Sequence, residues 1–198
     1  MQQPPEGLRL TDRLRLEPIG PQHAEDVWCL HQDPVVAEWN AGAWSHEEAA
    51  AFAASRARGW EQDGVSKWMA YQRDEGALVG RGGLSRMARA DAVTAQIEAL
   101  VTGTSWADNR LEVGWALRRE FQGHGYATEI GREALSFAGG VLGATAVIAF
   151  TEIHNRASRA VMERLEMDYV GQVRHGGLIE ALDGLQDTAP FAVYVICF

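Results

Sequence analysis

The sequence predicts a protein of the α/β or α+β class, in which a mixed sheet carries helices on both of its faces. Three observations predict it. Residues 127–138 carry apolar side chains at helical spacing, residues 111–117 alternate as a strand does, and residues 144–150 are almost continuously apolar. A short apolar run is typical of a strand that is buried on both faces. We therefore expect strands and helices to alternate in the second half of the chain.

Turn and cap residues predict the remaining elements. A turn near residues 11–12 interrupts the first strand, and Pro21 begins the first helix. Ser45 and Glu48 form an S-x-x-E capping box, which predicts the first turn of a second helix, and residues 74–76 are typical of a hairpin. The predicted strands lie at 8–19, 67–73, 77–84, 111–117, 144–150, 169–174 and 190–198. The predicted helices lie at 21–32, 45–63, 93–101, 127–138 and 155–166.

Composition limits the classes of protein that the chain can represent. Its 198 residues, 46% of them hydrophobic, can bury a core without disulfide or metal staples, so we predict one domain of residues 1–198. The net charge of −9 argues against a nucleic-acid partner, which would require clustered Lys and Arg. Cys29 and Cys197 lie in no metal-ligand spacing, and two lone thiols fit a reducing compartment. With no secretory signal or membrane-spanning stretch recognised, we expect a cytoplasmic protein without a membrane partner or a metal.

The stretch from Gln122 to Thr128 joins a predicted strand to a predicted helix. Backbone N–H groups in the first turn of a helix lack intrahelical partners, and together with the positive end of the helix dipole they suit a phosphate group. Gly123 and Gly125 carry no Cβ, so a pyrophosphate could approach the backbone closely. No lysine of the P-loop type is present, which argues against a nucleoside triphosphate. A glycine-rich connection without a ligand is the alternative interpretation.

The pattern Gln122-x-x-Gly125-x-Ala127 resembles the Q/R-x-x-G-x-G/A signature of the GNAT N-acetyltransferases. Three other parts of the chain are similar to the branch that contains the ribosomal-protein N-terminal acetyltransferases of the RimJ/RimL type. These parts are the opening strand at 11–16, the strand and turn at 112–129, and the N-x-x-S helix at 155–167. The resemblance covers about residues 8 to 175. It implies a single-domain GNAT-like fold with a mixed, mostly antiparallel central sheet, and acetyl-CoA as co-substrate.

The resemblance also implies which residues bind the cofactor. Backbone amides of the turn would hold the pyrophosphate of coenzyme A, the preceding strand would run along the pantetheine arm, and the start of the later helix would lie near the thioester. The residues concerned are Gln122, Gly123, His124, Gly125, Tyr126, Ala127 and Thr128 in the turn, Trp115, Ala116 and Leu117 in the strand, and Asn155 and Ser158 in the helix.

Acetyl transfer to an amine requires a neutral amine and a proton for the leaving thiolate. Glu112 is our candidate base, acting through water, with Glu180 in reserve, and Ser158 is the candidate proton donor. Each has a plainer alternative. Glu112 could be a solvated carboxylate or the partner of Arg110, Ser158 could bond its own backbone, and Asn155 could be a helix N-cap. Three tryptophans in loop-like segments, namely Trp39, Trp44 and Trp106, are further candidates for an acceptor pocket.

Three departures from the family pattern carry expectations of their own. Glu166 stands where the family usually has glycine, so we expect a different end to that helix. Met162 stands where many members have a tyrosine acid, which leaves the proton donor open. The segment at about 86–109 is longer than the branch normally has. We expect this atypical insert to shape the acceptor side, and formation of a homodimer is the alternative.

These observations predict an acetyl-CoA-dependent N-acetyltransferase. It would transfer an acetyl group to a primary amine, either a protein N-terminal α-amine or a small-molecule amine, by direct attack on the thioester. The alternative is a GNAT-fold module that binds acyl-CoA without turnover, as a sensor or as a partner-binding subunit.

Overall fold

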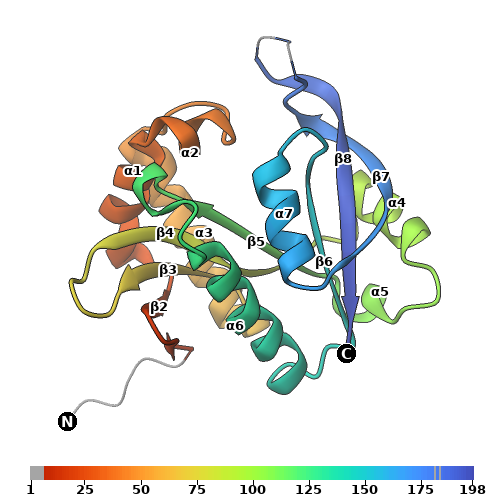
Figure 1. Ribbon diagram of the computed structural model, residues 1–198, viewed down its shortest axis with the longest axis horizontal. Helices are drawn as coiled ribbons and strands as arrows, with labels where there is room; N and C mark the ends of the chain where they lie inside the picture. Colours follow the sequence, from red (N-terminus) through yellow and green to blue (C-terminus); the bar gives the residue numbers. More distant parts are fainter. Residues whose placement is uncertain (1–6, 181, 183) are drawn as a thin grey trace. The chain divides into compact units, whose positions relative to one another are not determined.

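The computed structural model describes residues 7–180, 182 and 184–198, and its elements are labelled in Figure 1. The chain forms two compact units. The first comprises residues up to Ser85 together with Trp115–Glu133, and the second comprises Arg86–Gly114 with Ala134–Phe198. Strand β5 (Leu111–Leu117) and helix α6 (Tyr126–Gly140) each contribute residues to both units.

The first unit carries four antiparallel strands in the order β1-β2-β3-β4. Apolar side chains of its helices, of β3 and of the residue that follows β2 form one buried cluster, namely Ile19, Val27, Leu30, Val36, Ala49, Ala53, Met69 and Tyr71. The strands are β1 (Arg9–Leu10), β2 (Leu14–Pro18), β3 (Lys67–Gln72) and β4 (Leu78–Arg86). The helices are η1 (Pro21–His23), α1 (Ala24–Gln32), α2 (Pro34–Glu38), α3 (His46–Asp63) and η2 (Arg119–Phe121).

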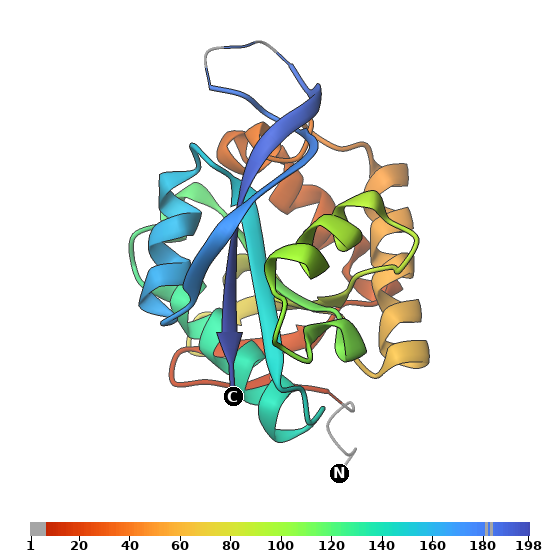
Figure 2. The ribbon, with the colours of Figure 1, turned by 90° about the vertical axis from the view of Figure 1, so that its right-hand side faces the viewer.

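The second unit contains strands in the order β5-β6-β8-β7. Strand β5 pairs with β6 in parallel, with Glu112 opposite Ile148, whereas β8 is antiparallel to both β6 and β7 (Figure 2). The remaining elements are α4 (Ala92–Leu100), α5 (Trp106–Asn109), β6 (Ala146–Glu152), α7 (Arg156–Arg164), β7 (Asp168–Gly177) and β8 (Gln186–Cys197).

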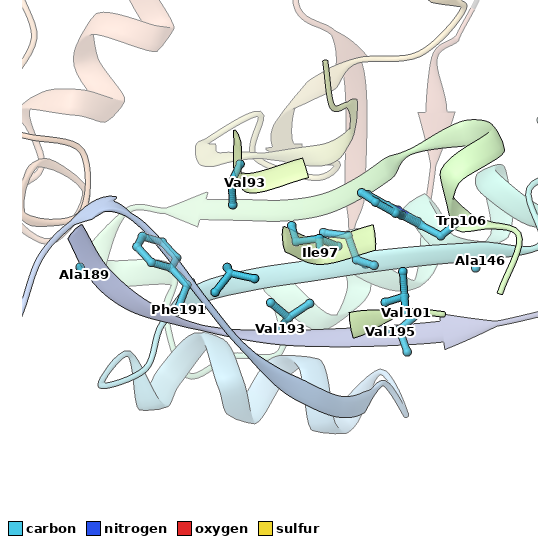
Figure 3. Packing of buried hydrophobic residues seen from close by; sticks show 11 residues of the cluster. Val93, Ile97, Val101, Trp106, Ala146, Ala189, Phe191, Val193 and Val195 are labelled. Atoms are coloured by element: carbon cyan, nitrogen blue, oxygen red, sulfur yellow. The ribbon is translucent and has the colours of Figure 1, made fainter. Parts of the chain in front are cut away.

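The segment at 86–109 is an integral part of the second unit's core. Val93, Ile97 and Val101 project from or just beyond α4, and Trp106 from α5, against β6 and β8 (Figure 3). Trp106 is fully buried, and its indole N–H donates to the Leu111 carbonyl oxygen at 2.8 Å. Removing this segment would therefore expose the apolar faces of two central strands.

Most elements lie where the sequence predicts them. The capping box is confirmed, because Ser45 Oγ accepts from the Glu48 N–H at 3.2 Å and the Glu48 carboxylate accepts from the Ser45 N–H at 2.7 Å. Strands β7 and β8 are longer than predicted, since the polar residues that extend them hide the strand periodicity. Helices α2 and α5 were not predicted, because one turn of helix is too short to show a repeat.

The expectation that helix α7 ends differently at Glu166 is wrong. Glu166 adopts a left-handed backbone conformation with φ +60°, which is the conformation that a glycine normally supplies at this position. The Met167 N–H donates to the Met162 carbonyl oxygen at 3.1 Å, as in a glycine-terminated helix. The helix end is therefore kept, and the glutamate bears the strain.

Candidate active site

The turn between β5 and α6 is built around two glycines. Gly123 and Gly125 have φ values of +78° and +84°, a region that side chains disfavour, so glycine is required for the path of the backbone as well as for access. The Gln122 side chain donates to the Leu117 carbonyl oxygen at 3.0 Å and ties the turn to the strand that precedes it. Helix α6 begins directly after these contacts.

The first turn of α6 leaves amide donors available. Its first backbone hydrogen bond runs from the Glu129 N–H to the Gly125 carbonyl oxygen at 3.0 Å. The amides of Tyr126, Ala127 and Thr128 precede that bond and have no carbonyl four residues back within the helix. This is the geometry in which a helix can hold a phosphate oxygen.

The hairpin between β1 and β2 holds the turn from one side. Arg13 donates through Nη1 to the His124 carbonyl oxygen at 3.0 Å, and through Nε to the Glu129 carboxylate at 2.7 Å. Thr11 donates its hydroxyl to the same carboxylate at 2.6 Å. Sequence reasoning missed Arg13 and Glu129 as functional candidates, although both lie within motifs that carried the resemblance.

Tyr126 is a structural residue of the turn. Its ring is buried, with the Arg13 guanidinium 4.3 Å from the ring centroid and Phe121 edge-on at 6.0 Å. Its hydroxyl accepts a hydrogen bond from the Gln72 side chain at 2.8 Å. The side chain of Tyr126 therefore packs within the protein, and we expect a ligand to contact the backbone amide of this residue.

Asp33 contacts η2, the segment that leads from β5 into the glycine turn. Its Oδ1 accepts from the Val35 N–H at 3.0 Å and caps α2, while its Oδ2 accepts from the Arg119 N–H in η2 at 2.9 Å. One carboxylate therefore joins the α1–α2 corner to the segment that leads into the turn.

The end of β5 lies very close to β4. The Arg118 N–H donates to the Val79 carbonyl oxygen at 3.0 Å. A Cβ at Gly80 would overlap the Ala116 carbonyl oxygen and would lie 2.8 Å from Leu117 Cα. Leu117 is buried, whereas Trp115 and Ala116 are partly exposed and have surface to offer a ligand.

The remaining candidates belong to the second unit. Glu112 lies on β5 and is partly exposed. Asn155 is the N-cap of α7, since its Oδ1 accepts from the Ser158 N–H at 3.1 Å. The side chain of Ser158 is partly exposed in the first turn of that helix, and Glu180 is exposed between β7 and β8. The N-cap interpretation of Asn155 is confirmed.

The candidate tryptophans have different environments. Trp106 is a core residue, so its expected place in an acceptor pocket is wrong. Trp44 stacks on His31 with 3.4 Å between ring centroids. Burial, together with the positive charge of Arg81, lowers the pKa of His31 from 6.5 to about 3. His31 is therefore neutral at physiological pH and packs as an aromatic ring.

In residues 7–180, 182 and 184–198, no group of three or more His, Cys, Asp or Glu side chains is arranged to hold a metal ion. Within the same part of the chain, no helix is both long enough and apolar enough to span a membrane.

A turn with two left-handed glycines between a strand and a helix end is compatible with the class of acyltransferases that use coenzyme A thioesters. The chain belongs to the GNAT acetyltransferase family, because residues 13–168 match the family model described as acetyltransferase (GNAT) domain. GNAT enzymes take their acetyl group from acetyl-CoA. The fold and the family expected from the sequence are therefore confirmed.

Other acetyltransferases resemble the chain in sequence or in fold. The chain is 30% identical to the FsC-acetyl coenzyme A-N(2)-transacetylase of Aspergillus fumigatus over 166 residues, which cover 81% of this chain but only 64% of that protein. Two solved structures share the fold. The ribosomal-protein-S5-alanine acetyltransferase of Vibrio fischeri has a TM-score of 0.70 at 12% identity, with 96% of each chain covered. The microcin C7 self-immunity acetyltransferase MccE, in complex with acetyl-CoA and AMP, has a TM-score of 0.70 at 16% identity, with 98% of each chain covered.

Proposed function

We propose that the chain is a single N-acetyltransferase domain that transfers the acetyl group of acetyl-CoA to a primary amine by direct attack on the thioester. The observation that carries the proposal is the turn between β5 and α6. Its two left-handed glycines, and the amides of the first helical turn that have no carbonyl partner within the helix, match what a pyrophosphate requires.

The donor half of the proposed site follows from this turn. The amides from Gly123 to Thr128 bind the pyrophosphate, and the backbone of Trp115, Ala116 and Leu117 accompanies the pantetheine arm. The fit is favourable because neither turn glycine carries a Cβ, so phosphate oxygens can reach the backbone. In the second unit, Asn155 and Ser158 are the proposed neighbours of the thioester.

The proposed chemistry uses two side chains. Glu112 accepts the amine proton through a water molecule as the new C–N bond forms. The C–S bond then breaks, and the Ser158 hydroxyl supplies a proton to the thiolate and regains one from solvent. A backbone N–H of β5 holds the carbonyl oxygen while it carries negative charge.

An α-amine is the acceptor that such a weak base suits best. Its pKa of roughly 8 leaves about a tenth of it neutral at pH 7, whereas the neutral fraction of a lysine side chain, with a pKa of about 10.4, is about 200-fold smaller. The names of two relatives support the transfer of acetyl groups to nitrogen, since one names an alanine of ribosomal protein S5 and the other an N(2) position. A protein N-terminus and a small-molecule amine are therefore the two acceptor classes to test first.

The segment at 86–109 is the proposed wall of the acceptor side, and dimerisation is the alternative. Because its apolar face is core, exposed positions must be altered instead of deleting the segment. Ala95→Arg should change the ratio of kcat/KM between two acceptors and leave the KM for acetyl-CoA unchanged. Size-exclusion chromatography of the same variant tests the dimer.

The decisive experiment measures thiol release from acetyl-CoA with a panel of amines. The panel includes peptides with free N-termini, the same peptides N-acetylated as controls, polyamines and aminoglycosides. Turnover that requires the free amine supports the proposal. Binding of acetyl-CoA by calorimetry without turnover on any amine would contradict it.

One observation favours a non-catalytic module that binds acyl-CoA. Met162 is 2% exposed and packs in the core at the position where many relatives have a tyrosine acid, so it offers no proton. The thiol-release assay distinguishes the two functions, since a sensor or partner-binding module would bind acetyl-CoA and release no thiol.

A further inference from the structure

The first turn of α6 contains a carboxylate at the place proposed to bind a pyrophosphate. Glu129 lies one turn into this helix, and a negative side chain there would repel the phosphate groups. If the turn binds coenzyme A, the charge of Glu129 has to be balanced by a group that does not block the site.

Four donors from the β1–β2 hairpin surround this carboxylate. Oε1 accepts from the Thr11 hydroxyl at 2.6 Å and from the Arg13 N–H at 2.9 Å. Oε2 accepts from Arg13 Nε at 2.7 Å, with Arg13 Nη2 at 2.6 Å. Burial by itself raises the pKa of Glu129. The hydrogen bonds from Thr11 and Arg13, together with the charge of Arg13, outweigh burial, so the pKa of Glu129 lies below its usual value. Glu129 is therefore ionised at neutral pH and paired.

Arg13 also contacts the turn itself. Its remaining nitrogen, Nη1, donates to the His124 carbonyl oxygen at 3.0 Å, which directs this oxygen toward the guanidinium. Its guanidinium stacks on Tyr126 at 4.3 Å, and Nη2 lies 3.5 Å from where a Cβ on Gly125 would be. The planar fork of arginine can serve the carboxylate and the carbonyl together, whereas a lysine ammonium cannot reproduce this geometry.

We propose that Arg13 is a positioning residue of the cofactor turn, which neutralises Glu129 and turns the His124 carbonyl toward itself so that the helix end accepts a pyrophosphate. The inference rests on the proposed function, because it assumes that this turn binds coenzyme A. It assigns the opening hairpin a role in cofactor affinity.

The chain offers a matched control one turn further along α6. Arg9 and Glu133 form a similar ion pair between the hairpin and the helix, with 3.6 Å between Arg9 Nε and Glu133 Oε1. This pair lies beyond the first helical turn and has no role in the proposal. Arg9→Gln should therefore leave the affinity for coenzyme A unchanged.

The experiment measures the Kd of coenzyme A by calorimetry for the wild type, Arg9→Gln, Arg13→Gln and the double variant Arg13→Gln/Glu129→Gln. We expect Arg13→Gln to bind about tenfold more weakly, because an uncompensated carboxylate then faces the phosphates. The double variant removes that charge and should recover to within about threefold of the wild type. In turnover, Arg13→Gln should raise the KM for acetyl-CoA and leave kcat at saturation almost unchanged.

The outcomes that would overturn the proposal are distinct from failure of the function. Equal Kd values for the wild type and Arg13→Gln would overturn it, as would a double variant as weak as Arg13→Gln. A lower kcat with unchanged KM would also overturn it, since this indicates a general structural defect. A wild type that binds no coenzyme A would instead refute the proposed function, and with it the premise of the inference.

Discussion

The carboxylate of Asp33 accepts a hydrogen bond from the backbone N–H of Arg119, 86 positions further along the chain, at 2.9 Å. The other oxygen of the same carboxylate caps helix α2 through Val35. The α1–α2 corner and the entrance to the cofactor turn are therefore fixed by one side chain. Any change in Asp33 should affect both stability and binding at the turn.

Asp33→Ala should lower the free energy of unfolding by about 1–2 kcal/mol, because it removes a helix cap and a second charged hydrogen bond. It should also weaken coenzyme A binding, since η2 is released. Chemical denaturation and calorimetry measure the two effects. Asp91→Ala is the matched control, because Asp91 occupies the N-cap position of α4 without a side-chain cap bond. An equal loss of stability in both variants would contradict the assignment.

Gly80→Ala should destabilise the first unit and weaken acetyl-CoA binding. Its new Cβ would overlap the Ala116 carbonyl oxygen and would push the end of β5 away from β4. Overpacking of this kind costs about 1–3 kcal/mol. Gly140→Ala serves as the control, since nothing lies within 4 Å of its Cβ position. If Gly80→Ala has the melting temperature and the acetyl-CoA affinity of the wild type, the end of β5 can move away from β4 without loss of stability, and the prediction is wrong.

Glu166→Gly should raise the free energy of unfolding by about 1 kcal/mol. Glycine adopts the left-handed conformation at φ +60° without the strain that a side chain incurs. Glu166→Ala keeps a Cβ and should show little gain. Denaturant midpoints with an unchanged m-value measure the difference between the two variants. A gain of the same size in Glu166→Ala would mean that the charge, and not the backbone, is responsible.

Acidification should destabilise the protein through His31. The pKa of His31 is about 3 in the folded chain against 6.5 when unfolded, so the unfolded state binds a proton first as the pH falls. The contribution of buried, neutral His31 to the free energy of unfolding is fully present above pH 6.5 and decreases as the pH falls toward 3. At pH 5 the free energy of unfolding has decreased by about 2 kcal/mol through this residue. Chemical denaturation at several pH values should show that the free energy of unfolding depends less steeply on pH in His31→Gln than in the wild type.

A control for this prediction is His175→Gln, because His175 is exposed on β7. It should retain the pH dependence of the wild type between pH 6.5 and 5. If the stability of His31→Gln depends on pH as steeply as that of the wild type, groups other than His31 cause the acid sensitivity.

Glu112→Gln should lower kcat and flatten the rise of the pH–rate profile, because the amide cannot accept a proton from the amine. The KM for acetyl-CoA should change little. Glu61→Gln, at an exposed position of α3, is the control and should leave the profile intact. A Glu112→Gln profile identical to that of the wild type would remove Glu112 as the base and make Glu180 the next residue to test.

Local patterns determined the elements of the fold and the turn. The stripe at 127–138, the Ser45–Glu48 capping box and the two glycines of the turn each depend on residues within a few positions of one another. The helical repeat at Val93 and Ile97 predicted α4 for the same reason. Helical periodicity, helix caps and tight turns depend on residues that are close together in the sequence, so they can be predicted from the sequence, and the structure contains the predicted elements.

Only the tertiary structure revealed which side chains hold the turn in place. Arg13 meets Glu129 across 116 positions, Asp33 meets Arg119 across 86, and Gly80 is required by the approach of Ala116. Trp106 lies in a segment that resembles a loop, yet it is core, because β6 and β8 cover it. Contacts of this kind depend on which strands become neighbours. That is decided by burial of apolar surface over the whole chain, and no short stretch of sequence records it.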